Sequence, residues 1–178
     1  MGNSTLGAHQ QGADATAGRW LTIPRTLCFV RHQDDILLIK RGPLRRVFPN
    51  QFNGIGGHIE RDEDPYTAAR REILEETGLE VIDLRLRGVH NIDAGQASGI
   101  ILFVFTAATS TRDFHDAGIE GSLHWVPVAE AAQLDLVEDL PHILPVILQM
   151  EPDAPPYFAH VSYDAEDSIV MRFTNITP

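Results

Sequence analysis

The chain has 178 residues and carries 14 Lys and Arg against 25 Asp and Glu, a formal net charge of −11. With 43% hydrophobic and 22% charged residues, its composition is that of a soluble globular domain and excludes a fibrous or wholly disordered chain. The acidic balance argues against a basic face for duplex nucleic acid, and the longest apolar run, residues 100–105, is too short to span a bilayer. We therefore expect neither duplex nucleic acid nor a membrane as a partner.

The single cysteine, Cys28, excludes an intrachain disulfide and a zinc site built from cysteines alone. It favours a reducing compartment, so we expect a cytoplasmic protein in which Cys28 is a buried apolar residue. Residues 1–18 are rich in Gly, Ala, Gln, Ser and Thr and show no apolar periodicity, which predicts a disordered N-terminal tail. No later linker divides the chain, so we expect one domain over 19–178.

In chain order, hydrophobic patterning predicts an irregular alternation of strands and helices. A hairpin is expected first, with strands over 26–30 and 36–41 around a polar turn at 32–35, followed by a loop over 42–51 and an extended segment over 52–59. Later strands are expected over 81–89, 100–107, 123–126, 157–163 and 168–173, and helices over 128–134 and 139–150. This order predicts the α/β class with a mixed sheet.

The most clearly marked element is a helix over 65–77. Asp64 is a good N-cap, Pro65 fits the first helical position, and Gly78 stands where a left-handed C-terminal cap is expected.

Three glutamates of this helix, Glu72, Glu75 and Glu76, are spaced so that their carboxylates share one face. Like charges at this spacing repel unless a cation compensates, and carboxylate oxygens on a rigid element suit Mg²⁺ or Mn²⁺. Ala69 and Ile73 form an apolar pair on another side of the helix, which can dock on the sheet. The competing interpretation is a solvated acidic helix face.

The spacing around these glutamates decides between the two interpretations. Gly57 is followed after five residues by Glu63 and, after seven more, by the run Arg-Glu-Ile-Leu-Glu-Glu-Thr-Gly-Leu over 71–79. This pattern matches the Nudix box at every fixed position, and the sequence therefore resembles the Nudix hydrolase family. The resemblance implies an α/β/α sandwich fold and a divalent cofactor, Mg²⁺ with Mn²⁺ as an alternative.

Carried over to this sequence, the resemblance assigns the metal ligands to the carboxylates of Glu72, Glu75 and Glu76 and to the backbone carbonyl of Gly56. Arg71 matches an arginine that braces the box by pairing with a box glutamate, for which Glu63 is the candidate. The alternative for Arg71 is an ordinary surface ion pair.

The reaction implied by the resemblance is the hydrolysis of a nucleoside diphosphate linked to another group. Bound metal would lower the pKa of an attacking water and neutralise charge on the phosphoryl oxygens, and a carboxylate would accept the water's proton. Candidates for that catalytic role are Glu75, Glu76 and Glu120, which matches a loop glutamate of oxidised-purine triphosphatases. The alternative for Glu120 is a solvated loop carboxylate.

Basic residues gather in one loop of this acidic chain: Lys40, Arg41, Arg45 and Arg46 lie within seven positions. Such a loop could bind the outer phosphates of a nucleoside triphosphate, or it could serve solubility alone.

The stretch around this loop also resembles enzymes that hydrolyse oxidised purine nucleotides. The resemblance makes Asn53 a candidate to hydrogen-bond the base, Phe52 or Phe48 a stacking contact, and Asp139 a further substrate residue. A turn asparagine and core phenylalanines are the alternative. Two positions differ from the resembled enzymes: Val137 replaces a stacking tryptophan, and Leu140 replaces a second acid, so the base stays open.

The leading expectation is therefore cleavage of a nucleoside triphosphate, with an ordinary or oxidised base, to monophosphate and pyrophosphate. Alternatives are hydrolysis of ADP-ribose or a dinucleoside polyphosphate, a non-catalytic nucleotide-sensing module, and an isomerase of the isopentenyl diphosphate type that would use a cysteine. Nudix domains are often dimeric, so a homodimer stays open, although no segment marks an interface.

Overall fold

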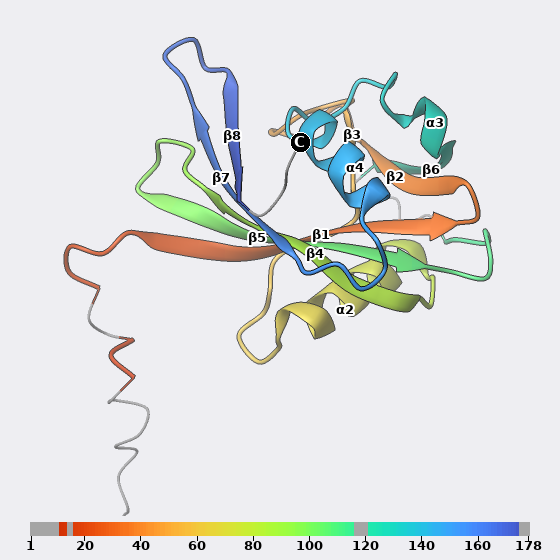
Figure 1. Ribbon diagram of the computed structural model, residues 1–178, viewed down its shortest axis with the longest axis horizontal. Coiled ribbons are helices and arrows are strands. Elements are labelled where there is room, and N and C mark those ends of the chain that lie inside the picture. Colours follow the sequence, from red (N-terminus) through yellow and green to blue (C-terminus); the bar gives the residue numbers. More distant parts are fainter. Residues whose placement is uncertain (1–10, 14–15, 116–120, 175–178) are drawn as a thin grey trace, which may run out of the picture.

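The computed structural model describes residues 11–13, 16–115 and 121–174. These residues form one mixed sheet with helices on both faces (Figure 1). The strands are β1 (Leu21–His32), β2 (Asp35–Arg41), β3 (Phe52–Asn53), β4 (Ile82–Ile92), β5 (Ser98–Ala108), β6 (Gly121–Pro127), β7 (Tyr157–Tyr163) and β8 (Ile169–Thr174). The helices are α2 (Pro65–Thr77), α3 (Val128–Ala131) and α4 (Leu140–Gln149).

The strands lie in the order β3-β2-β1-β5-β4-β7-β8, and β6 pairs with β2. The pairs β1–β5 and β4–β7 are parallel, whereas β1–β2, β2–β3, β2–β6, β4–β5 and β7–β8 are antiparallel. The expected mixed sheet is thereby confirmed. Of the expected N-terminal tail, residues 1–10 and 14–15 lie outside the described residues.

Strand β1 separates two cores because its side chains alternate between the two faces of the sheet. Cys28 and Val30 pack with Ala69 and Ile73 of α2 on one face. On the other face, residues of β1 and β2 pack against α4 in a cluster that includes Leu27, Phe29, Ile36, Leu38, Leu140, Ile143, Leu144 and Ile147. The result is the α/β/α sandwich that the resemblance implies, and Cys28 is fully buried.

The predicted elements agree with the structure most closely where local signals are strong. Helix α2 and strand β7 have the predicted limits, and the predicted hairpin is β1–β2, with His32 opposite Asp35. Strand β1 begins five residues before the predicted start at Thr26. Its first four residues are exposed and show no burial pattern; they are strand because Leu21 to Pro24 pair with β5.

The predicted helix over 128–134 is shorter than expected. Helix α3 ends at Ala131, and the chain continues in tighter turns, with the amides of Gln133 and Leu134 bonded to carbonyls three residues earlier. Within the described ranges, none of the helices has the length and apolarity needed to cross a membrane.

Candidate active site

Helix α2 is fixed at both ends by its caps. The Asp64 carboxylate accepts hydrogen bonds from the amides of Tyr66 and Thr67 at 2.8 and 3.1 Å. At the other end, Gly78 has a φ of 70° and donates to the carbonyl of Leu74 at 2.8 Å. A side chain at this position would therefore be strained. These caps set where the helix begins and ends, and thereby which turn carries the box glutamates.

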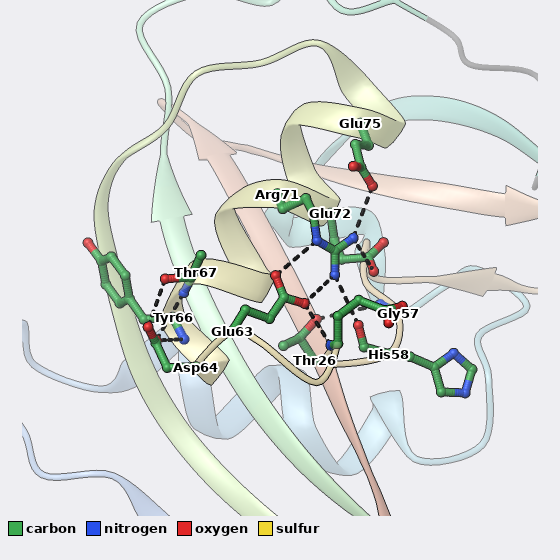
Figure 2. A network of polar contacts seen from close by, with 11 residues as sticks. Thr26, Gly57, His58, Glu63, Asp64, Tyr66, Thr67, Arg71, Glu72 and Glu75 are labelled. Atoms are coloured by element: carbon green, nitrogen blue, oxygen red, sulfur yellow. Dashed lines mark hydrogen bonds and ion pairs between the residues drawn. The ribbon is translucent and has the colours of Figure 1, made fainter. Parts of the chain in front are cut away.

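Arg71 organises the acidic face of α2 (Figure 2). Its Nε and Nη2 donate to the two oxygens of Glu63 at 3.0 and 2.5 Å, a bidentate pair. Its Nη1 donates to Glu72 Oε1 at 2.9 Å and Glu75 Oε2 at 3.0 Å, and Nη2 also donates to the carbonyl of His58 at 3.1 Å. One guanidinium thus ties the helix to the loop that precedes it. The pairing of Arg71 with Glu63, suggested from the sequence, is present.

Two glycines allow this loop to lie against both the helix and β1. Gly56 has a φ of 150°, and a Cβ built there would lie 2.2 Å from the carbonyl oxygen of Thr26. A Cβ at Gly57 would lie 2.5 Å from Glu72 Oε1. The loop is also bonded to β1, since the amide of Thr26 donates to the carbonyl of Gly57 at 2.9 Å. The Glu72 carboxylate can therefore lie against the backbone of this loop because Gly57 has no side chain.

The charges of this cluster stabilise one another. Hydrogen bonds from Arg71 lower the pKa of Glu63, and bonds to Glu63, Glu72 and Glu75 raise the pKa of Arg71. Burial raises the pKa of Cys28, and the negative charges of Glu76 and Glu72 raise it further. The acidic face of α2 therefore acts on the buried thiol of β1 as well as on Arg71.

The carboxylate oxygens of this cluster are suitable ligands for a hard divalent cation. In the structure, the cation that pairs with Glu63, Glu72 and Glu75 is Arg71. Among the described residues, no three acidic, histidine or cysteine side chains are gathered in a geometry ready to hold a metal. The Glu75 side chain is 59% exposed, and exposed ion pairs contribute little stability. Glu75 can therefore exchange its bond to Arg71 for a metal ion at small cost.

The structure brings several predicted substrate residues together at the edge of the sheet. The amide of Phe52 donates to the carbonyl of Asp135 at 2.8 Å, and the amide of Val137 donates to the carbonyl of Phe52 at 2.9 Å. The segment before α4 therefore lies beside β3, which carries Asn53. Asp139 follows this segment as the N-cap residue of α4. Val137 is buried in the core on the α4 side.

The surroundings of these residues differ. Asn53 is half-buried, and its side-chain oxygen accepts a hydrogen bond from Gly54 at 2.9 Å. The ring of Phe52 packs edge-on against His124, with Lys40 Nζ 5.5 Å from the ring centre. Burial raises the pKa of Asp139 to about 6, and its Oδ1 is buried without a hydrogen-bond partner among the described residues.

The arginines of the basic loop differ in their surroundings. Arg41 Nε donates to the carbonyl of Val47 at 2.9 Å, so this side chain bonds to its own loop. Arg45 donates its amide to the carbonyl of Gly42 in a turn, and Arg46 is exposed. Glu120, the predicted loop carboxylate, lies outside the described residues.

Sequence analysis missed a polar group beside Asp139. His90 is fully buried and its Nε2 lies 2.8 Å from the Tyr157 hydroxyl, while the Tyr163 hydroxyl donates to Glu138 at 2.7 Å. The charge of Asp139 raises the pKa of both tyrosines, in addition to the effect of burial. Alternation along β7 places Tyr157 and Tyr163 on one face, and that pattern could have indicated the group.

Comparison with known proteins agrees with this geometry. The NUDIX domain family model matches residues 21–147. The chain is 28% identical over 109 residues to human diphosphoinositol polyphosphate phosphohydrolase NUDT4B, covering 61% of this chain and 59% of that protein. It is 27% identical over 128 residues to the uncharacterized Nudix hydrolase YvcI of Bacillus subtilis, covering 70% of this chain and 78% of YvcI. The match therefore spans about three fifths of the human relative's length.

Solved structures share the fold. The MutT protein of Bacillus halodurans superposes with a TM-score of 0.73 at 24% identity, covering 87% of this chain and 99% of that chain. The NUDIX domain of Shewanella oneidensis NrtR, solved with ADP ribose, superposes with a TM-score of 0.63 at 19% identity, covering 82% and 98%. At these identities the structures show the fold alone. The family model covers most of the chain, and the box lies on the helix and loop described above, so the protein belongs to the Nudix family.

Proposed function

We propose that this protein is a divalent-metal-dependent hydrolase that cleaves a phosphoanhydride bond in a nucleoside diphosphate linked to a further group. A nucleoside triphosphate, cleaved to monophosphate and pyrophosphate, is the leading substrate class. The observation that carries the proposal is the contact between the acidic face of α2 and the glycine loop, with Glu72 against Gly57 and Arg71 bonded to both elements. The domain limits, the cytoplasmic location and a homodimer stay predictions.

The residues that would hold the metal are Glu72, Glu75 and Glu76, together with the backbone carbonyl of Gly56. When bound, the metal would neutralise phosphoryl charge and acidify a water molecule. Arg71 holds Glu72 and Glu63 in place, so its catalytic contribution is positioning. Glu75 and Glu76 of the box, together with Glu120, stay the candidates for the carboxylate that accepts the proton from water.

In the proposed reaction, water adds to a phosphorus atom and the bond from that phosphorus to the bridging oxygen breaks. The carboxylate takes the proton that the water loses, and the leaving phosphate carries away the bridging oxygen. Caps at both ends fix where helix α2 begins and ends, so the backbone that carries the carboxylates needs little reorganisation during the step.

For the substrate, we propose that the base lies at β3 beside the segment before α4. Asn53 would hydrogen-bond the base and the Phe52 ring would contact it, with Asp139 as a further polar group. Arg46 is better placed than Arg41 to contact phosphate, because Arg46 is exposed whereas Arg41 is bonded to the carbonyl of Val47, and Arg45 stays a candidate. Each of these assignments rests on position and side-chain chemistry.

Two other substrate classes follow from the named relatives. ADP ribose is bound by the NrtR domain, and the human relative is named for diphosphoinositol polyphosphates. Both contain the phosphoanhydride bond that the proposed chemistry cleaves. An isomerase that uses a cysteine is disfavoured, because Cys28 is fully buried between the sheet and α2 and its pKa is raised.

The experiment that tests this proposal is a turnover screen with Mg²⁺ and with Mn²⁺, in which products are identified as well as counted. The substrates are the nucleoside triphosphates, 8-oxo-dGTP, dinucleoside polyphosphates, ADP-ribose, NADH and a diphosphoinositol polyphosphate. Monophosphate and pyrophosphate from one or a few triphosphates would support the leading class. Absence of turnover with every substrate and both metals would contradict an enzymatic role.

The Glu76→Gln variant tests the metal assignment. We expect it to lower kcat by at least about 100-fold with little change in stability, because it removes a carboxylate from a repulsive acidic cluster. Glu80→Gln, which changes an exposed carboxylate just after the helix, is the matched control and should retain wild-type turnover. Wild-type turnover in Glu76→Gln would overturn the assignment of this residue.

A further inference from the structure

A second concentration of positive charge lies on the face of the sheet opposite to α2. Arg31 at the end of β1 and Arg85 and Arg87 on β4 surround a hollow of about 280 Å³, closed on one side by the end of α4 and the residues that follow it. Cys28 and Val30 of β1 face α2, so Arg31 points to the α4 side by strand alternation. We call these three arginines and the hollow the arginine pocket. It is separate from the box helix.

The arginine pocket contains more positive than negative charge. Arg85 is paired with Asp83 at 2.9 Å and with Asp153 at 3.2 Å. Among the described residues, no carboxylate lies within ion-pair distance of Arg31 or Arg87. Three guanidinium groups thus have only two of the described carboxylates to compensate them, which leaves a local excess of positive charge in a chain whose net charge is −11.

Arg87 is a buried cation with neutral partners. The residue is only 7% exposed. Its Nε donates to the Thr106 hydroxyl at 2.8 Å, and Nη1 donates to the carbonyl of Glu151 at 2.9 Å. Burial and the nearby charge of Arg85 lower the pKa of Arg87. An anion in the hollow would relieve both costs.

Arg31 has donor capacity that the protein leaves unused. Its Nε is buried and has no hydrogen-bond partner among the described residues. Its Nη2 makes a long bond of 3.4 Å to the carbonyl of Gln33. A buried donor without an acceptor costs free energy, and a ligand that accepts from it recovers that cost.

We propose that the arginine pocket binds a small phosphate-bearing anion. Guanidinium groups recognise phosphate through paired N–H donors, and the volume suits inorganic phosphate, pyrophosphate or the phosphate end of a nucleotide better than a whole nucleotide. This inference goes beyond the proposed function, because the pocket lies across the sheet from α2 and is formed by residues that have no part in the proposed reaction.

The test is a binding titration without divalent metal, in EDTA at constant ionic strength, by isothermal calorimetry. Phosphate, pyrophosphate and AMP are the probes, which distinguishes an inorganic anion from a nucleotide phosphate. We expect at least one to bind, and Arg31→Gln to weaken that binding by 10-fold or more, with Arg31→Lys intermediate because it keeps the charge and loses the fork. Arg172→Gln, which changes an exposed arginine on β8, is the control and should leave binding unchanged.

Two further measurements keep the outcome decisive. The Nε–H resonance of Arg31 in the wild-type protein should shift on titration, and this readout does not depend on whether a variant folds. Glu76→Gln should retain anion binding, which separates this pocket from the proposed active site. The proposal is overturned if none of the probes binds, if the Arg31 resonance does not move, or if Glu76→Gln abolishes binding that Arg31→Gln retains.

Discussion

Arg71 shows how one side chain can organise several others. It donates to Glu63, Glu72 and Glu75 and to the carbonyl of His58 (Figure 2). The guanidinium fork is needed for this, since a lysine ammonium is a compact charge that cannot donate in parallel to both Glu63 oxygens and also reach Glu72. The residue therefore explains why an acidic helix face, otherwise repulsive, is stable in the structure.

We expect Arg71→Lys to lower the free energy of unfolding by about 1–3 kcal/mol, because carboxylates that now share one cation would face each other with weaker compensation. Turnover should fall as well, through misplacement of Glu72. Arg85→Lys is the matched control, since its partners Asp83 and Asp153 are well exposed, and its loss of stability should be smaller than that of Arg71→Lys. Urea denaturation measures both. Equal losses in the two variants would contradict the role of Arg71.

At the scale of an element, the loop before α2 works because its backbone approaches two different neighbours. Gly56 meets the backbone of β1, which cannot move, whereas Gly57 meets the end of a side chain, which can rotate. The two glycines are adjacent in sequence, yet substitution at each should produce a different result.

We expect Gly56→Ala to destabilise the protein by about 2–4 kcal/mol, because its Cβ would clash with the Thr26 carbonyl at a φ unfavourable to alanine. Gly57→Ala should cost less than about 1.5 kcal/mol and instead lower kcat/KM by at least about 10-fold, by displacing the Glu72 carboxylate. Thermal unfolding and steady-state kinetics on the two variants make the comparison. Similar stability losses in both would show that the loop packs otherwise.

At the scale of the whole molecule, two buried groups give stability opposite dependences on pH. Burial lowers the pKa of His90 from 6.5 to about 4, so the native state resists its protonation and stability falls as pH drops from 6.5 towards 4. Burial raises the pKa of Asp139 from 3.8 to about 6, so the native state holds a proton that the unfolded chain releases, and stability falls as pH rises through this range. The two effects offset each other between pH 4 and 6.

Asp139→Asn should therefore remove one of the two opposing effects and leave the pH dependence of stability that His90 causes. Relative to the wild type, the variant should gain little stability near pH 4 and about 2 kcal/mol above pH 6, because it removes the cost of ionising a buried carboxyl. Chemical denaturation at several pH values measures the difference between the two proteins. Asp62→Asn, at an exposed position, is the control and should show a flat difference. A flat difference for Asp139→Asn would contradict the burial argument.

The sequence by itself determined the features that depend on local chemistry. The limits of α2 follow from a capping aspartate, a proline at the first turn and a C-terminal glycine, each acting within a few residues. The family follows from the fixed spacing of the box, and the hairpin and β7 follow from alternation. The mixed sheet could be expected from the order of these elements.

Only the tertiary structure decided what depends on residues distant in sequence. The first four residues of β1 are exposed, and they are strand because they pair with β5, so no local pattern marks them. The bond from Arg71 to the carbonyl of His58, the pairing of β3 with the segment before α4, and the meeting of Arg31 with Arg85 and Arg87 all join separate elements. Burial and charge at such places depend on which strands become neighbours in the sheet. The sequence alone does not indicate which arginines will line one pocket.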